Sequence, residues 1–379
     1  MKRNRHQQVI VSYDKAIVIS YFILLLAGLL VMLNLTAIQD EMGYFYRHAA
    51  FLAISVVAAL MILHFFDLNK LKPLNIIIMA GSIALLVAVL IVGRTHKGGT
   101  RAISLGFISI QPSFIARVAL IFYYAQHLSK KHEELKEANL KDLWKHFYPL
   151  VFATAVVYTL ITLERHLSTL IISGMTLLGM VTYAGIRMRY VLSVSLAGVL
   201  LVFVIITFGA EFRSARLETY KAYFLLTRNA SSETLKADDY QVRESMTALV
   251  RGGWFGTGVG KGRAKHFYLP ESRTDYVYTI IGEEFGFLGA MIIFGLHCLL
   301  FFRAFKVAQS QEDIYLRFLC AGLAMNIFFN VLVNTGVAMS ILPSTGTTLP
   351  FISYGGTALL VDSASMGVIL NISAKRRQL

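Results

Sequence analysis

The sequence predicts an all-α polytopic membrane protein with about ten transmembrane helices. Hydrophobic residues fill 56% of the 379 positions, and charged residues fill only 15%. The mean hydropathy of +0.61 is well above that of an ordinary soluble domain. These values favour a chain that lies mostly within a bilayer.

The predicted spans are apolar runs of about 20 residues, the length that crosses the hydrocarbon core as a helix. The first run follows "MKRNR". It is too long for a signal peptide and has no small-residue cleavage site after it, so we expect an uncleaved helix. The ten predicted spans are residues 15–37, 47–66, 73–93, 111–128, 147–165, 167–186, 190–209, 276–302, 316–342 and 354–372.

Lysine and arginine in the short loops predict the orientation. Loops on the side of the termini hold 17 of these residues, whereas the opposite short loops hold 5. Because positively charged loops stay in the cytoplasm, both termini are expected there. The large loop at about 210–275, between the seventh and eighth helices, is then extracellular. No repeat or linker divides the chain, so residues 1–379 are expected to form one membrane domain.

The end of that loop is rich in glycine and positive charge. "RGGWFGTGVGKGRAKHFYLPESRTD", residues 251–275, holds six glycines and five Lys or Arg. Such a backbone can approach a ligand closely, and the cations attract anions. The segment lacks the ending of a Walker loop. A flexible, turn-rich loop without a ligand is the alternative.

Asp275 is the first candidate for chemistry. It stands just before the eighth span, where a helix N-cap is a sufficient explanation for an aspartate. Its setting also suits a general base, because cations precede it and the membrane boundary follows. Both interpretations stay open on the residues alone.

Two further carboxylates, Glu283 and Glu284, follow in the same predicted helix. An ionisable group at membrane depth is a functional candidate by default, with pairing to an arginine as the structural alternative. Arg117, in the fourth span, needs such a counter-charge. We expect Glu283 or Glu284 to supply it, with Glu164 as the other candidate.

Polar groups also mark the last two spans. Asn326, Asn330 and Asn334 recur every four residues on one helical face, which indicates hydrogen bonds between helices or a groove for a polar head group. Asp362 extends this pattern. "LPSTGTTLPFISYGG", residues 342–356, is a broken stretch at membrane depth, which survives there only beside protein or a water-filled cavity.

Together these features resemble the FtsW/RodA/SpoVE, or SEDS, family of peptidoglycan glycosyltransferases, slightly more the FtsW branch. The resemblance covers nearly the whole chain. It is strongest in "YQVRESMTALVRGGWFGTGVGKGRAKHFYLPESRTDYVYTIIGEEFGFLG", residues 240–289, and in "TGTTLPFISYGG", residues 345–356. Two long motifs in the family's order are far more specific than either one alone.

The resemblance implies that the chain polymerises lipid II at the outer face of a bacterial cytoplasmic membrane. Asp275 matches the family's essential aspartate and would act as general base. The implied partner is a class B penicillin-binding protein; membrane lipid is a further partner, and no nucleic acid is expected. The residues expected to bind substrate are Lys265, Arg263, Lys261, Arg101, Arg216, Glu283, Glu284, Ser353, Tyr354, Gly355, Gly356, Asn330 and Asn334.

Two parts of the family pattern differ in this chain. The pattern "QPSE" followed by Lys is matched by Gln111, Pro112 and Ser113, but Phe114 replaces the glutamate and Arg117 the lysine. In the "PDLGT" pattern, His166 replaces the aspartate. This part of the cavity is therefore expected to be less acidic. The residues expected to shape it are Gln111, Pro112, Ser113, Arg117, His166 and Pro350.

No residue spacing gives a metal site, and the only cysteines, Cys298 and Cys320, fall in predicted spans. Assistance by a divalent cation, Mg or Mn, stays open. The main alternatives to polymerisation are transport of lipid II across the membrane and a non-catalytic scaffold for the penicillin-binding protein. Transport would favour broken helices near the membrane centre, whereas the predicted breaks lie at the outer surface.

Overall fold

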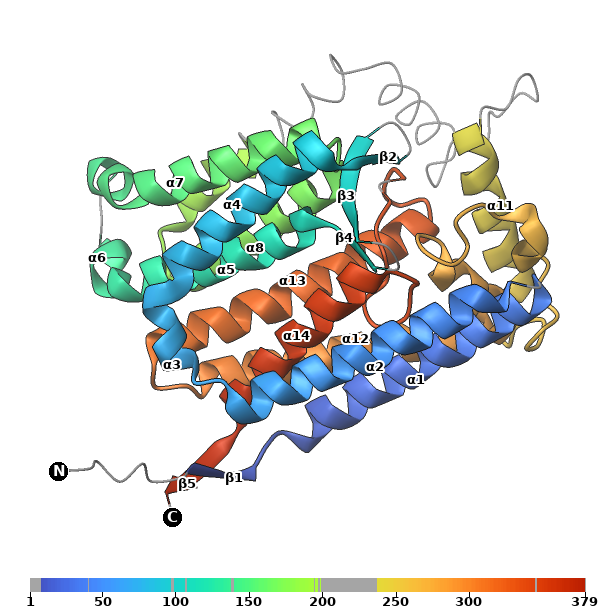
Figure 1. Cartoon of the computed structure of the whole chain (residues 1–379), viewed down its shortest axis with the longest axis horizontal. Coiled ribbons are helices and arrows are strands. Elements are labelled where there is room, and N and C mark those ends of the chain that lie inside the picture. The colour runs from blue at the N-terminus through green and yellow to red at the C-terminus, as the bar shows by residue number, and fades with distance from the viewer. Residues whose placement is uncertain are drawn as a thin grey trace.

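The computed structural model shows a bundle of long helices (Figure 1). Much of the seventh predicted span and the first part of the large loop, including Arg216, lie outside the described residues. The structure describes residues 8–39, 41–96, 99–105, 108–137, 140–193, 195–196, 198, 237–344 and 346–378.

The helices match the predicted polytopic fold. Seven stretches of the described chain are long and apolar enough to cross a membrane, and α5 and the shorter α8 occupy the fourth and sixth predicted spans. The long helices are α1 (Lys15–Ile38), α2 (Met42–Phe65), α4 (Asn75–Val92), α5 (Pro112–Lys130), α7 (Leu140–Leu163), α8 (Leu167–Tyr183), α11 (Ala237–Gly252), α12 (Val277–Gln309), α13 (Ile314–Ala338) and α14 (Gly356–Ser373). Short helical segments are α3 (Leu68–Leu71), η1 (Lys72–Leu74), α6 (His132–Glu137) and the π-helical turn η2 (Ala264–Tyr268).

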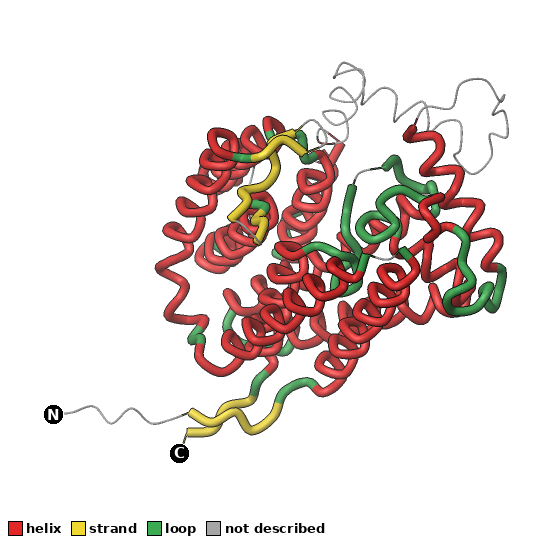
Figure 2. Tube along the Cα trace, turned by 45° about the vertical axis from the view of Figure 1, so that its right-hand side comes forward, coloured by secondary structure: helices red, strands yellow, loops and turns green. Residues whose placement is uncertain are grey.

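Two small sheets lie at opposite ends of the bundle (Figure 2). Strands β1 (Gln8–Ser12) and β5 (Lys375–Gln378) pair antiparallel, which holds both ends of the chain together. This pairing confirms that the termini share one side, as an even number of spans requires. The other sheet, in the order β2-β3-β4 (Arg94–His96, Gly99–Leu105, Ile108–Ile110), marks what we call the distal end.

Aspartates cap two of the long helices at the terminal end. Asp14 accepts hydrogen bonds from the backbone N–H groups of Ala16 and Ile17, at 3.0 and 3.1 Å, and its other oxygen accepts from Arg303 at 2.5 Å. Asp313 caps α13 in the same way and binds Lys72 at 2.6 Å. The caps satisfy free amides of the first turn and link separate helices.

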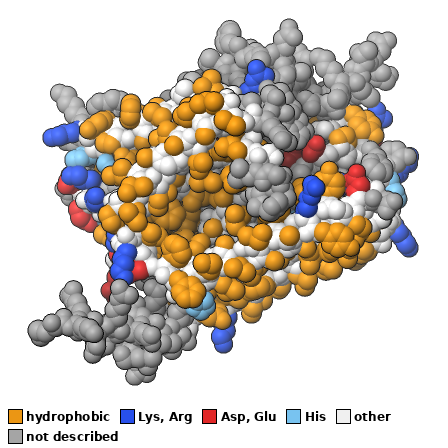
Figure 3. All heavy atoms as spheres, in the orientation of Figure 1, with side chains coloured by type: hydrophobic (Ala, Val, Ile, Leu, Met, Phe, Trp, Pro, Cys, Tyr) orange, Lys and Arg blue, Asp and Glu red, His pale blue; other side chains and the backbone are white. Residues whose placement is uncertain are grey.

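The surface has the layout of a membrane protein. Hydrophobic side chains cover the middle of the face in Figure 3, and charged side chains lie mainly toward the two ends. Large apolar residues are strongly exposed along the helices, for example Phe65 at 81% and Ile91 at 78%. In water such a surface would be unfavourable, whereas lipid chains cover it at no such cost.

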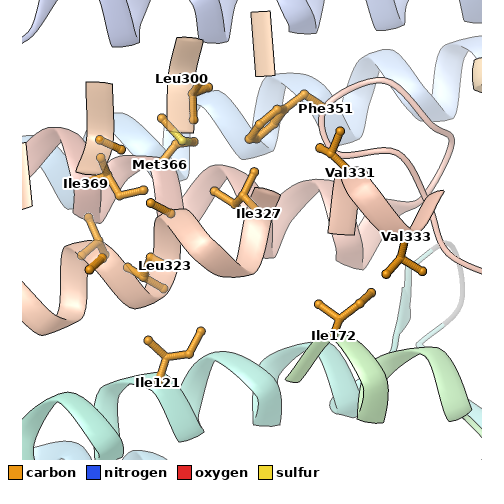
Figure 4. Close-up of a cluster of buried hydrophobic side chains, with 14 of the residues drawn as sticks. Ile121, Ile172, Leu300, Leu323, Ile327, Val331, Val333, Phe351, Met366 and Ile369 are labelled. Carbon is orange, nitrogen blue, oxygen red and sulfur yellow. The ribbon is translucent and has the colours of Figure 1, made fainter. Parts of the chain in front are cut away.

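The core is built around α13, which is buried along most of its length. Figure 4 shows Leu323, Ile327 and Val331 of α13 among side chains from neighbouring helices. Ile121 of α5 and Ile172 of α8 approach from one side. Leu300 of α12, Phe351 and residues of α14 approach from the other, so α13 joins the two halves of the bundle.

Helix α12 is broken at Gly286, which has φ 70° and ψ −170°. The conformation suits glycine, and a Cβ there would lie 2.3 Å from the backbone nitrogen of Gly256. The 23 residues from Phe287 to Gln309 already give about 35 Å of helix, enough to cross the hydrocarbon core alone. Glu283 and Glu284 therefore lie in the short, buried piece of α12 that precedes the break.

Candidate functional site

Asp275 lies at the distal end, in a turn that leads into α12. The helix begins at Val277 with Tyr276 in the N-cap position, so Asp275 is one residue outside the cap. Tyr276, and not Asp275, therefore occupies the N-cap position. Its side chain is half-buried.

The backbone of Asp275 is held by α13. The side-chain nitrogen of Asn334 donates to the carbonyl of Asp275 at 2.9 Å and to the carbonyl of Thr347 at 2.6 Å. One buried amide thus joins the turn before α12 to the loop before α14. Asn334, expected to touch substrate, acts here on the position of Asp275.

The loop before α14 packs over the same turn. Ser353 Oγ donates to the carbonyl of Thr274 at 2.6 Å and accepts from the backbone N–H of Leu349 at 2.8 Å. Tyr354 N–H donates to the carbonyl of Arg273 at 2.8 Å. Gly346 has a φ of 71°, which favours glycine, and it lies beside the carboxylate. A Cβ at this position would be in van der Waals contact with Asp275 Oδ2, at 3.4 Å. The loop therefore forms one wall beside the carboxylate.

A third distal segment, between α1 and α2, is attached through Arg273. Its guanidinium donates to Gln39 and forms an ion pair with Glu41. It also lies over the ring of Tyr44, 4.4 Å from the centroid, and Tyr44 contacts Tyr354 edge to face at 5.4 Å. Burial raises the pKa of the Tyr354 hydroxyl above its ordinary value.

Lys265 does not have the exposed position expected of a pyrophosphate ligand. Its side chain is completely buried and forms an ion pair with Glu284, and its ammonium also donates to Asn34 Oδ1 at 3.1 Å. The amide of Asn34 donates to the same glutamate. This group ties η2 to α1 and α12, so Lys265 and Glu284 both have buried partners within the protein.

Glu283 fixes the start of the same turn. Its two oxygens accept from the backbone N–H groups of Arg263 and Ala264, at 2.8 and 2.9 Å, and Arg251 lies 3.5 Å away. Arg263 and Lys261 keep exposed side chains and remain the cations of this loop able to meet an anion. The side chain of Arg101, in β3, is not among the side chains that the structure describes.

Arg117 is paired with a different carboxylate from the one expected. Asp362 of α14 lies 4.0 Å from its Nη2, and both side chains are almost fully buried. The predicted pairing with Glu283 or Glu284 is wrong, because those carboxylates bind the loop around Lys265. Within the described structure, none of the three guanidinium nitrogens of Arg117 has a hydrogen-bond partner.

The residues that replace the family pattern contact one another. His166 Nδ1 and Ser113 Oγ are 2.9 Å apart, and Thr169 Oγ1 lies 3.1 Å from the same nitrogen. The Phe114 ring packs edge to face on His166, with 5.6 Å between ring centroids. The Arg117 guanidinium lies over the same Phe114 ring, 5.4 Å from its centroid. His166 thus stands as a hydrogen-bonding side chain against the Phe114 ring that also contacts Arg117.

Other predicted residues join these segments. Thr357 Oγ1 accepts from the Gln111 N–H at 3.2 Å and donates to the Ser109 carbonyl at 2.7 Å, which joins the start of α5 at Pro112 to α14. The Pro350 carbonyl accepts from His297 at 3.2 Å. Gly355 and Gly356 form the beginning of α14.

The interior next to α13 contains polar atoms that are not satisfied. The side-chain atoms of Asn326 and Asn330 are buried and have no hydrogen-bond partner in the described part of the chain. Buried polar groups are usually satisfied by water when protein does not serve them. Neither side chain therefore forms a direct hydrogen bond between helices within the described residues. Across the described ranges, no three His, Cys, Asp or Glu side chains are placed to hold a metal ion.

The sequence did not indicate Gln39, Glu41 and Asn34, and it indicated Arg273 only as one of the cations before Asp275. Their partners come from segments far apart in the chain, and Asn34 is 231 positions from Lys265. No local spacing signals such a contact. Asp362 was visible as a buried polar residue, but its pairing with Arg117 was not.

Ser353→Ala is expected to lower the free energy of unfolding by about 1–3 kcal/mol, because it leaves the buried Leu349 N–H and Thr274 carbonyl without their shared partner. Thermal unfolding of the purified protein measures this effect. Ser129→Ala, which removes a hydroxyl bonded only within its own helix, should change stability much less. Equal stability of the two variants would exclude the proposed role of Ser353.

Comparison with known sequences identifies related proteins. The family model FTSW_RODA_SPOVE, described as a cell cycle protein, matches residues 14–378. The chain is similar to the probable peptidoglycan glycosyltransferase FtsW of Alcanivorax borkumensis, with 32% identity over 96% of this chain and 93% of that protein. It is also similar to stage V sporulation protein E of Bacillus subtilis, with 32% identity over 97% of this chain and 98% of that protein.

Solved structures have the same fold. A chain from a peptidoglycan synthase complex that coordinates polymerization and crosslinking superposes with a TM-score of 0.75, at 24% identity, over 96% of this chain and 98% of that chain. RodA, the rod shape determining protein of Thermus thermophilus, gives a TM-score of 0.68, also at 24% identity, over 96% of this chain and 97% of that chain. These likenesses confirm the polytopic helical fold.

Proposed function

The chain belongs to the FtsW/RodA/SpoVE family, and we propose that it is a peptidoglycan glycosyltransferase that joins lipid II units into glycan strands. Relatives named FtsW cover almost the full chain. The observation that carries the proposal is the attachment of the Asp275 turn to three distal segments, since a general base must be held in one position.

In the proposed reaction, Asp275 accepts the proton of the acceptor 4-hydroxyl. The hydroxyl oxygen forms a bond to the anomeric carbon of the donor, and the bond from that carbon to the lipid pyrophosphate breaks. The attack inverts the anomeric centre, and the pyrophosphate leaves with the electron pair. One base and neutralising cations are sufficient for this chemistry, whereas glycoside hydrolysis uses paired carboxylates.

Arg263 and Lys261 are the described loop cations proposed to meet the pyrophosphate, because their side chains are exposed. Arg101 and Arg216 remain further candidates from the sequence. Ser353, Tyr354 and Asn334 support the site by holding the backbone around Asp275. Asn330 would line the hydrated interior beneath it.

The chain is a multi-pass membrane protein. We propose that its termini are cytoplasmic, from the excess of Lys and Arg in the loops on that side. The distal end with Asp275 then faces outward, where lipid II is polymerised. A class B penicillin-binding protein is the proposed partner, consistent with the related complex that combines polymerization and crosslinking.

Transport of lipid II is the competing function. It would need a path through the membrane, whereas Asp275 and the loops around it gather at one end of the bundle. The deciding experiment incubates the purified protein with lipid II and separates the products by chain length, with and without the partner. Long glycan strands support polymerisation; unchanged lipid II together with its movement across vesicles supports transport.

Lys261→Ala and Arg263→Ala are expected to raise the lipid II concentration needed for half-maximal rate several-fold, because each removes an exposed cation from the pyrophosphate site. The difference from wild type should shrink at high salt, where exposed charges are screened. Lys70→Ala is the matched control, since Lys70 is exposed at the terminal end. An unchanged concentration dependence in both loop variants would remove them from the substrate site.

A further inference from the structure

The end of α11 and the glycine-rich loop after it expose a group of large apolar side chains at the distal end. Val250 is 78% exposed, Trp254 67%, Phe255 82% and Val259 62%. We call these four residues the apolar tip. They are far more exposed than their chemistry favours in water, so their natural environment is an apolar one.

The apolar tip is fixed to α12 through its backbone. Thr257 and Gly258 N–H groups donate to the carbonyls of Glu283 and Glu284, at 2.9 and 3.0 Å, and Phe287 N–H donates to the carbonyl of Gly253 at 2.8 Å. These bonds from the loop satisfy the two carbonyls and the amide that lose their helical hydrogen-bond partners at the break at Gly286. The height of the tip is therefore set by α12.

That height lies at the start of the unbroken, apolar part of α12. Phe287 there is 51% exposed and the neighbouring Leu288 45%, as expected of side chains that face lipid. Trp254 packs edge to face on Phe287, with 5.1 Å between ring centroids. The apolar tip therefore continues the lipid-facing surface of α12 at its distal end.

The chemistry around the tip matches a membrane interface. Lys261 flanks it with an exposed side chain that can reach lipid phosphates, and Arg251 on its other side lies 3.5 Å from Glu283. Tryptophan with neighbouring basic residues is typical of segments that lie at the head-group level. We propose that the apolar tip inserts into the distal leaflet of the bilayer and anchors the loop there, with phospholipid as the occupant.

The experiment uses the intrinsic fluorescence of Trp254. The chain has two tryptophans, so Trp144→Phe leaves Trp254 as the single probe. The full-length variant is placed in nanodiscs of phosphatidylcholine, with or without bromine atoms on the acyl chains near the head group. We expect the brominated lipid to remove about half of the Trp254 emission, because the ring lies at the head-group boundary. Iodide in the buffer should quench little.

A second probe tests the tip independently. Phe255→Trp in a chain that lacks both native tryptophans should behave in the same way. Phe302→Trp, a 63% exposed site within the spanning part of α12, is the control for contact with lipid. Quenching of Trp254 and of the Phe255 probe by iodide, without an effect of bromine, would overturn the proposal. Protection from both quenchers would also overturn it, since another protein surface would then cover the tip.

Discussion

Replacing Asp275 by asparagine is expected to abolish synthesis of glycan strands from purified lipid II, with a loss of rate of at least about 10²-fold. Asparagine has the same size and keeps one acceptor oxygen, but it cannot take the proton of the acceptor hydroxyl. The measurement is the yield of long strands at saturating lipid II. The loss should therefore appear in the maximal rate.

This substitution leaves the folded structure intact for a specific reason. The bond between Asn334 and the Asp275 segment uses the main-chain carbonyl, which the substitution does not change. Expression and thermal unfolding should therefore match the wild type. Asp67→Asn is the matched control, since it changes a half-exposed aspartate that caps α3 at the terminal end, where asparagine caps equally well. Wild-type polymerisation by the Asp275→Asn protein would refute the role of Asp275 as the base.

The helical fold was predictable because a segment that crosses lipid must be apolar, and hydropathy measures this property directly. A run of about 20 apolar residues satisfies its backbone internally as a helix, whatever its neighbours are. The pairing of β1 with β5 agrees with the even number of spans. The break at Gly286 was harder to predict, although a helix of 33 residues exceeds what a bilayer requires, and a glycine in it is a signal of a break.

The candidate site was predictable only in part, for the opposite reason. The motifs identified Asp275 and the loops near it, because these positions match the motifs of the family. The contacts of charged residues depend on which helices meet in space. Lys265 looked like a surface cation by sequence, and its burial follows from Asn34 on α1 and Glu284 on α12. The spacing of residues along the chain does not show which helices contact each other.

Removing the carboxylate of Asp362 is expected to be among the most destabilising changes in the protein. Asp362→Leu leaves the guanidinium of Arg117 almost fully buried, without its counter-charge. Breaking a buried ion pair by removing one partner costs about 3–5 kcal/mol. Thermal unfolding in detergent should show a large decrease in the midpoint. Ser365→Ala on the same helix, which removes a hydroxyl bonded to its own helix, should have a small effect.

The double variant Arg117→Met with Asp362→Leu separates the pair from packing effects. If the carboxylate acts mainly as the counter-charge of Arg117, removing both charges should recover most of the lost stability, since no unpaired charge stays in the interior. The difference between the double variant and the sum of the two single variants measures the coupling. If Glu283 or Glu284 were the true partner, Asp362→Leu alone would cost little and the two changes would simply add. Strong coupling would mean that this chain neutralises Arg117 from α14, and so keeps a buried cation without the glutamate of the family pattern.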